Sequence, residues 1–426
     1  MEVCALMNRL TDFLITLFFL LVFVAPQSFS FIKLPILGFI LLYVLLNILF
    51  GKLKIYSFDA INYYFFISLI SLVWILIGVL NDNNVTALYD AFRLFVVYNA
   101  IYILLLIYIT NRNFYKNVLP IISIAAILIA LIAFYTVIDQ VYNLESIPLV
   151  ISHEMFLLAG IHSGYTELGN INIGMYSFLL PFLLSFIIMD GNKKNKLTYF
   201  ALFISVLAVI LASRRMIIFL IILVPFLCLI IDLFITTKLN LKIFYKVAKI
   251  YLPILMMLCL VFLLSYYFDM FDTVGFSERI TDALIYNENS VRQTQFKSLI
   301  DGFYENPIMG SGFGGEASVI RSADRPWNYE LTYPKVLFHA GIIGVLFLVT
   351  LFSYYTFKSL KLCVKNKRYY SINVSLMVGF VSVLIASASN PYMNSFDYLF
   401  ILAIPPLIIS LVKKDKFYSM VYQNDS

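Results

Sequence analysis

The sequence predicts an all-α polytopic integral membrane protein of about twelve transmembrane helices, with a large extracytoplasmic loop that contains short helices. Hydrophobic residues make up 62% of the 426 residues and charged residues only 13%, against roughly 45–50% and about 25% in globular domains. Apolar stretches near the roughly 20 residues that a helix needs to cross hydrocarbon recur along the chain. Their regular spacing is interrupted by one long polar segment, residues 269–334.

The apolar stretches, in chain order, lie at residues 10–26, 33–50, 60–80, 93–110, 118–138, 172–189, 197–212, 216–236, 250–268, 335–357, 370–388 and 396–412. The first is predicted to be an uncleaved span, because Pro26 occupies its only small-residue cleavage position. Residues 1–268 then form a transmembrane domain of spans 1–9 with a smaller outer segment at 139–171. Residues 269–334 form an extracytoplasmic subdomain, and residues 335–426 carry spans 10–12 and a cytoplasmic tail.

The positive charges indicate which side each connection faces. Lys-rich connections alternate with Lys-poor ones, and the positive-inside rule therefore places both termini in the cytoplasm. The net charge of +6 thus follows from membrane orientation and does not indicate nucleic-acid binding. The arginines predicted to face outward are Arg93, Arg214, Arg215, Arg279, Arg292, Arg321 and Arg325. A guanidinium group matches phosphate oxygens bidentately, which favours an anionic ligand; pairing with loop carboxylates is the alternative.

Two patterns stand out in the long polar segment. Ser290-Val-Arg-Gln293 has the form of a capping box, and an apolar face follows at helical spacing until Asn306-Pro307, formed by Phe296, Leu299, Ile300 and Phe303. This pattern predicts a short amphipathic helix on the membrane surface. Arg292 lies in its first turn, where the helix dipole disfavours a cation, so a phosphate partner or simple exposure is expected. In Gly310-Ser-Gly312-Phe-Gly-Gly315 we expect the glycines to adopt positive φ and to let the backbone approach a membrane helix or a ligand closely.

Neither a metal nor a cofactor is expected. His153 and His162 do not have the spacing of a helical zinc pair, and the outer segments contain no Asp-x-Asp motif. Glu330, just before the tenth predicted span, is a candidate general base. An ion pair with Arg325 or Lys335 is the alternative for this carboxylate.

Together these motifs resemble the bacterial O-antigen polymerase and O-antigen ligase superfamily. The resemblance is carried by the Ser213-Arg214 turn, by Arg292 with an aromatic residue four positions later, and by Asn306-Pro-Ile-x-Gly-x-Gly312 ahead of a closing span entered through Tyr333. It covers roughly residues 200–350 in motifs and the whole chain in architecture. The His-Asn pair of the ligases is missing, because Glu330 stands at that spacing, so the polymerase is favoured.

The resemblance implies a metal-independent glycosyltransferase of the bacterial cytoplasmic (inner) membrane that polymerises undecaprenyl-pyrophosphate-linked oligosaccharides at the outer face. It implies catalytic roles for Arg214, Arg292 and Glu330. The expected substrate-binding residues are Arg215, Arg279, Arg321, Arg325 and Tyr333. The expected partners are the lipid-linked substrate, the bilayer and a polysaccharide chain-length regulator, with no nucleic acid. A ligase and a twelve-span flippase of the same substrate are the rival hypotheses.

Overall fold

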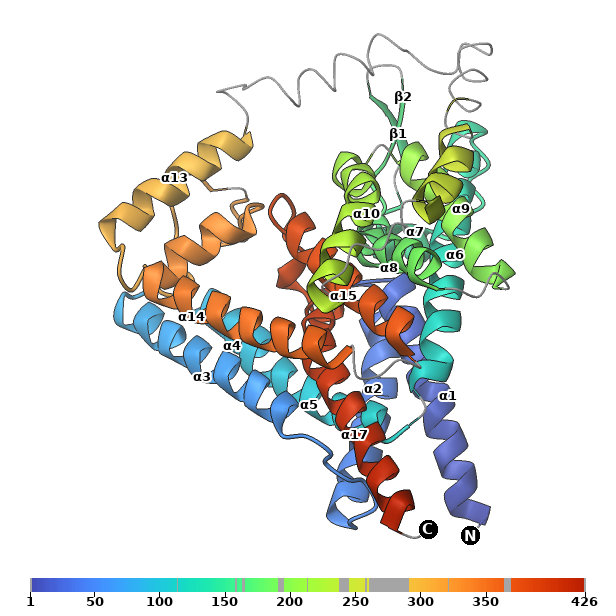
Figure 1. Cartoon of the computed structure of the whole chain (residues 1–426). Coiled ribbons are helices and arrows are strands. Elements are labelled where there is room, and N and C mark those ends of the chain that lie inside the picture. Colours follow the sequence, from blue (N-terminus) through green and yellow to red (C-terminus); the bar gives the residue numbers. More distant parts are fainter. Residues whose placement is uncertain are drawn as a thin grey trace. The chain divides into compact units, whose positions relative to one another are not determined.

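A computed structural model describes residues 2–112, 114–157, 159–162, 165–190, 195–212, 214–236, 245–256, 259, 291–320, 322–363 and 369–424 (Figure 1). Within them the chain is almost entirely helical, with a single short hairpin. It divides into two compact units. The first unit comprises residues 1–36, 115–287 and 371–382, and the second comprises residues 37–114, 288–370 and 383–426.

Nine helices in the described part of the chain are long and apolar enough to cross a membrane, which confirms a membrane-embedded protein. They lie at Met7–Val24, Ser30–Leu49, Asp59–Leu80, Val85–Asn111, Tyr115–Gln140, Ile171–Met189, Arg215–Phe234, Thr332–Cys363 and Phe396–Lys416. Two predicted spans correspond to shorter apolar helices, Lys196–Leu211 and Tyr370–Ala386. Most of the predicted span 250–268 lies outside the described residues, so the total of twelve stays a prediction.

The first unit is built around a buried helix, α8 (Tyr176–Met189), whose residues 176–188 are all buried. Its other elements are α1 (Glu2–Val24), the start of α2 (Ser30–Leu49), α6 (Phe114–Val141), α7 (Leu149–Met155), β1 (Ala159–His162), β2 (Tyr165–Leu168), η2 (Ile171–Met175), α9 (Lys196–Leu211), α10 (Arg215–Thr236) and part of α15 (Tyr370–Ala386). Residues 245–256 are also helical. Since α8 packs against both α9 and α10, it has an apolar surface all round.

The predicted outer segment 139–171 contains α7 and the antiparallel hairpin β1–β2. It is joined to the turn after α1, where the Glu154 carboxylate accepts a hydrogen bond from the Phe29 backbone N–H at 2.9 Å. The Ser28 hydroxyl donates to the Glu154 carbonyl at 2.7 Å. Phe29 has a φ of 52°, and these bonds help to hold this strained turn in place.

The second unit contains α3 (Asp59–Leu80), α4 (Val85–Phe92), the π-helical η1 (Arg93–Val97), α5 (Tyr98–Asn111), α13 (Val291–Glu305) and α14 (Thr332–Cys363). The chain ends with η4 (Tyr392–Asn394), α16 (Phe396–Leu399), η5 (Phe400–Ala403) and α17 (Ile404–Asn424). Helix α3 lies beside α14, and α13 packs against the first part of α14 (Figure 1).

A break in α14 explains why the glycine-rich loop, residues 306–315, packs against this helix. Gly341 has φ 59° and ψ −170°, which interrupts the helical hydrogen bonds around it. The freed carbonyls of Phe338 and His339 accept from Ser311 and Gly312, and the amides of Ile342 and Ile343 donate to Pro307 and Ile308. The loop therefore takes the place of a helical turn, and every backbone group named here has a partner.

The predicted positive φ is confirmed at three of the four glycines of the run but not at Gly315. Gly310, Gly312 and Gly314 have φ values of 72°, 78° and 79°. A Cβ on Gly312 would lie 2.3 Å from the backbone nitrogen of Gly78, near the end of α3. The loop thus approaches a membrane helix too closely for any side chain at that position.

The predicted short helix is also confirmed as α13, which ends before Asn306-Pro307; Ser290 of the predicted capping box lies outside the described residues. Leu299 is buried in a small core with Ala317, Tyr329 and Phe338. The Tyr329 hydroxyl accepts the Ala317 N–H at 2.6 Å, and burial raises the pKa of this phenol. Phe296, predicted on the apolar face, is instead 48% exposed because the core of this helix is centred on Leu299.

Candidate functional site: a cavity with a cationic end

The second unit contains a cavity of about 570 Å³. It lies among α3, the α4–η1–α5 segment, α13, the glycine-rich loop, α14 and the residues around η4 and η5. Most of its wall is apolar or aromatic. The aromatic lining residues are Tyr64, Trp74, Phe95, Tyr102, Phe296, Phe313, Trp327, Tyr333 and Phe352. A wall of this kind suits the hydrocarbon part of a ligand.

The charged lining residues are Asp90, Arg93, Arg325 and Lys335. Arg93 is paired with Asp90 at 2.7 Å. Lys335 donates to the amide oxygen of Asn394 at 3.0 Å, and Arg325 is exposed. Among the described residues, neither Arg325 nor Lys335 forms an ion pair with a carboxylate. These two cations are therefore available to an anionic ligand.

Arg292 and Glu330, two predicted catalytic residues, form an ion pair; neither lines the cavity itself, although Asn328 and Phe296, which is in the same helix as Arg292, do. The Arg292 Nε atom is 2.8 Å from a Glu330 carboxylate oxygen, and the two side chains are 53% and 21% exposed. Among the described residues Glu330 pairs with neither Arg325 nor Lys335, the two alternatives from the sequence. It pairs with Arg292 instead, because α13 packs against the first part of α14. Exposed pairs of this kind contribute only about 0–1 kcal/mol, so a phosphate can compete for the arginine.

Tyr333, predicted to bind substrate, also lines the cavity. Its hydroxyl donates to the Leu384 carbonyl, and the residue is 48% exposed. The hydrogen bond fixes the phenol, so its ring offers a flat apolar face and its hydroxyl is already engaged. Tyr333 is therefore placed to contact a ligand by packing.

Arg214 and Arg215 belong to the first unit. Arg214 immediately precedes α10, and its guanidinium donates to the Leu168 carbonyl at the end of β2 at 3.0 Å. Arg215 is the first residue of α10 and is exposed. Convergence of Arg214 and Arg292 on one pyrophosphate stays a prediction, since the two residues lie in different units. Arg279 and Arg321 lie outside the described residues.

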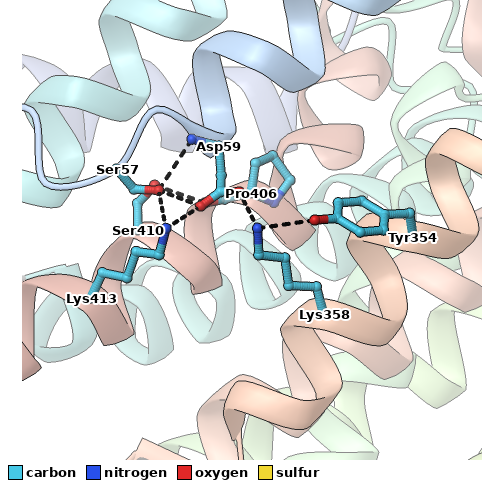
Figure 2. Close-up of polar contacts among 7 residues, drawn as sticks. All are labelled: Ser57, Asp59, Tyr354, Lys358, Pro406, Ser410 and Lys413. Carbon is cyan, nitrogen blue, oxygen red and sulfur yellow. Dashed lines mark hydrogen bonds and ion pairs between the residues drawn. The ribbon is translucent and has the colours of Figure 1, made fainter.

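The structure adds a charged cluster that the sequence did not identify (Figure 2). Asp59 is 8% exposed at the start of α3 and is paired with both Lys358 of α14 and Lys413 of α17. Ser57 donates to the same carboxylate at 2.6 Å. The lysines were recognised only as topology signals, and Asp59 lies 299 and 354 residues from them in sequence. Only the fold brings them together.

These contacts define two ends of the second unit. The lysine end comprises Lys54, Arg112, Lys358, Lys413 and Lys414; there the Lys54 amide donates to Asn111, and Lys414 donates to the Arg112 carbonyl. The arginine end comprises Arg93, Arg292, Arg325 and Lys335. Helix α3 runs from Asp59 at the lysine end to Gly78 beside the glycine-rich loop, and α14 runs the opposite way.

The chain matches no protein-family model, no curated protein and no solved structure.

Proposed function

We propose that the protein is a membrane-embedded glycosyltransferase that joins oligosaccharide repeat units carried on undecaprenyl pyrophosphate, as an O-antigen polymerase does. The observation that carries this proposal is the cavity of the second unit, whose long apolar wall ends at Arg325 and Lys335. A polyprenyl pyrophosphate has the complementary form, with an apolar chain attached to a compact anionic group. Arginine suits such a group because its fork matches phosphate oxygens.

The reaction follows from this placement. An acceptor sugar hydroxyl attacks the anomeric carbon of the donor, and the pyrophosphate leaves with the bonding electron pair. Arg292 and Arg325 stabilise the charge that grows on the departing oxygens. When the phosphate attracts Arg292, the Glu330 carboxylate is released from its ion pair and accepts the hydroxyl proton.

The distribution of basic residues supports an outward-facing site. Predicted cytoplasmic connections supply the lysine end, and the other end carries the arginines. The site therefore faces the outside of a bacterial cytoplasmic membrane, with both termini inside. In a cysteine-free background, cysteine at Ser322 should react with an impermeant thiol reagent added outside, whereas cysteine at exposed Lys361 should not. The reverse labelling pattern would refute this orientation.

A flippase is the non-enzyme rival. Transport of a charged headgroup across the membrane calls for polar groups along the whole path. In the described lining, the charged residues are at the arginine end: the ion pair Asp90–Arg93 and the cations Arg325 and Lys335. The wall towards Tyr64 and Phe352 is aromatic. This asymmetry supports chemistry at one face over passage through the protein.

The decisive experiment uses purified protein in liposomes with lipid-linked repeat units and a chelator. We expect a ladder of polymer lengths, strongly reduced by Glu330→Gln and unchanged by Lys361→Ala in the last turn of α14. Movement of the lipid between leaflets without polymer would establish the flippase instead. Glycan transfer to a lipid core or a protein, without a ladder, would establish the ligase.

A further inference from the structure

A turn at the arginine end brings three different kinds of side chain to the cavity. The Asn328 backbone N–H donates to the Arg325 carbonyl at 3.0 Å, which closes a four-residue turn with Pro326 at its second position. Proline is favoured at that position because its ring fixes φ. The next residue, Tyr329, is fully buried in the small core beneath α13, which holds the turn in place. Arg325, Trp327 and Asn328 all line the cavity.

The orientation of the Asn328 amide follows from its neighbours. The Lys335 ammonium can only donate, so the Asn394 atom that accepts from it at 3.0 Å is the amide oxygen. The nitrogen of that same amide therefore faces Asn328, whose oxygen accepts from it at 2.7 Å. The Asn328 amide nitrogen is the last donor of this chain of hydrogen bonds. It bonds to no described residue, and it stays accessible, because the side chain is only half-buried and lines the cavity.

Trp327 offers a different kind of contact. It is half-buried, and among the described residues its ring stacks on no other aromatic ring and its indole N–H has no hydrogen-bond partner. The indole combines a flat apolar face with one donor at its edge. A sugar ring is complementary to it, because the C–H groups on one face of a sugar are apolar and the oxygens at its edge accept hydrogen bonds. A phosphate has no apolar face, and a prenyl chain has no oxygen to accept from either donor.

We infer that Trp327 and Asn328 bind the first sugar of the lipid-linked substrate, with the sugar stacked on the indole and one of its oxygens accepting from the Asn328 amide. The inference rests on the proposed function and names the part of the substrate that these residues recognise. The first sugar is bonded directly to the pyrophosphate, and Arg325, which is proposed to bind that group, belongs to the same turn. The sugar site and the phosphate site are therefore neighbours in the protein, as the two groups are in the substrate.

The probes are a polyprenyl pyrophosphate bearing one N-acetylhexosamine and the same lipid without a sugar, and the measurement is the Kd of each. The parent protein should bind the sugar-bearing lipid more tightly. Trp327→Leu, which keeps an apolar side chain without the flat ring, should weaken that binding about 10-fold and leave the sugar-free lipid within about 2-fold. Trp327→Phe keeps a flat ring and should retain most of the preference. Asn328→Ala removes one donor and should weaken binding of the sugar-bearing lipid about 5-fold.

Phe352→Leu is the matched control. It also replaces an aromatic lining residue by leucine, but in the aromatic wall of the cavity, twenty residues further along α14 than its first residue, Thr332. It should change the Kd of both lipids alike. Every variant is first compared with the parent by thermal unfolding in detergent, so that binding is measured only on folded protein.

A second measurement needs only the parent and Trp327→Phe. The chain has two tryptophans, and Trp74 is 3% exposed with its indole N–H bonded to the Met309 carbonyl at 2.8 Å. The sugar-bearing lipid should shift the tryptophan fluorescence of the parent more than the sugar-free lipid does. This difference should disappear in Trp327→Phe. A difference that persists in that variant would show that the sugar does not contact Trp327.

The outcomes distinguish this inference from the proposed function. If the parent binds neither lipid, both are wrong. If it binds both lipids equally, the cavity still takes the lipid and the sugar site is refuted. A preference that survives both Trp327→Leu and Asn328→Ala refutes the role of these two residues. Equal weakening of both lipids by Trp327→Leu also refutes it, because the indole would then pack on the prenyl chain.

Discussion

At the lysine end of the second unit, Asp59 lies between two ammonium groups, whereas at the arginine end Arg325 and Lys335 have no carboxylate partner in the described part of the chain. Both ends are basic, but they differ in how the charge is compensated. Charges that are satisfied within the protein hold helices together. Charges left without a counterion on a cavity wall are placed for an external anion. The comparison predicts that substitutions at one end reduce stability and at the other end reduce activity.

The largest effect is expected for Glu330→Gln at the arginine end. Loss of a general base slows a reaction by roughly 10²- to 10⁴-fold, while the exposed Arg292 pair contributes little to stability. We expect a loss of polymerisation rate in that range with thermal unfolding close to that of the parent. Normal activity at normal protein level would remove Glu330 from the mechanism and leave it with a structural ion pair.

Gly312→Ala should give the next largest effect, and it tests the glycine-rich loop beside Gly78, at the end of α3 far from Asp59. The added methyl group would meet the Gly78 backbone at 2.3 Å, and φ is 78°. Together these cost about 3 kcal/mol, from strain in the left-handed region and from overpacking. Thermal unfolding in detergent measures the loss. The control is Gly38→Ala in α2, where a Cβ meets nothing within 4 Å and no loss is expected.

Asp59→Asn should reduce stability by about 2 kcal/mol, because it leaves Lys358 and Lys413 close together without their carboxylate. The figure lies below that for a fully buried pair, since the lysine side chains are 30% and 43% exposed. Thermal unfolding should shift while the rate per folded molecule changes little. Exposed Asp324 provides the control, and Asp324→Asn should not shift the transition. An unshifted Asp59→Asn would mean that the cluster does not hold these helices together.

The sequence could predict what depends on local pattern. Helix α13 follows from residue spacing and a proline, and the glycine-rich loop follows from the positive φ that glycine tolerates. Pairing between distant residues could not be predicted. The Asp59 cluster joins segments about 300 or more residues apart, and the Arg292–Glu330 pair depends on α13 packing against α14. The break at Gly341 could not be predicted either, because its φ is fixed by the carbonyls of the loop packed against it.

The smallest effect is expected from a comparison of two arginines within the arginine end. Arg93 and Arg325 both line the cavity, but only Arg93 has a carboxylate partner among the described residues, Asp90 at 2.7 Å. We expect that a cation without a carboxylate partner binds the ligand and that a paired cation does not. Arg325→Ala should then weaken binding of sugar-free polyprenyl pyrophosphate about 10-fold, as for one charge-assisted hydrogen bond. Arg93→Ala should change it about 2-fold or less, because Arg93 is already engaged by the Asp90 carboxylate and contributes little to binding an external anion.

Arg325→Lys provides the matched control for the geometry of the guanidinium fork. Lysine keeps the charge but makes no bidentate contact, so its binding should lie nearer that of Ala than that of Arg. The measurement is the Kd of each variant at low and at physiological salt. Equal losses for Arg93→Ala and Arg325→Ala would show that the cavity responds only to total charge. The distinction between cations with and without a carboxylate partner would then be wrong for the arginine end, where the reaction is proposed to occur.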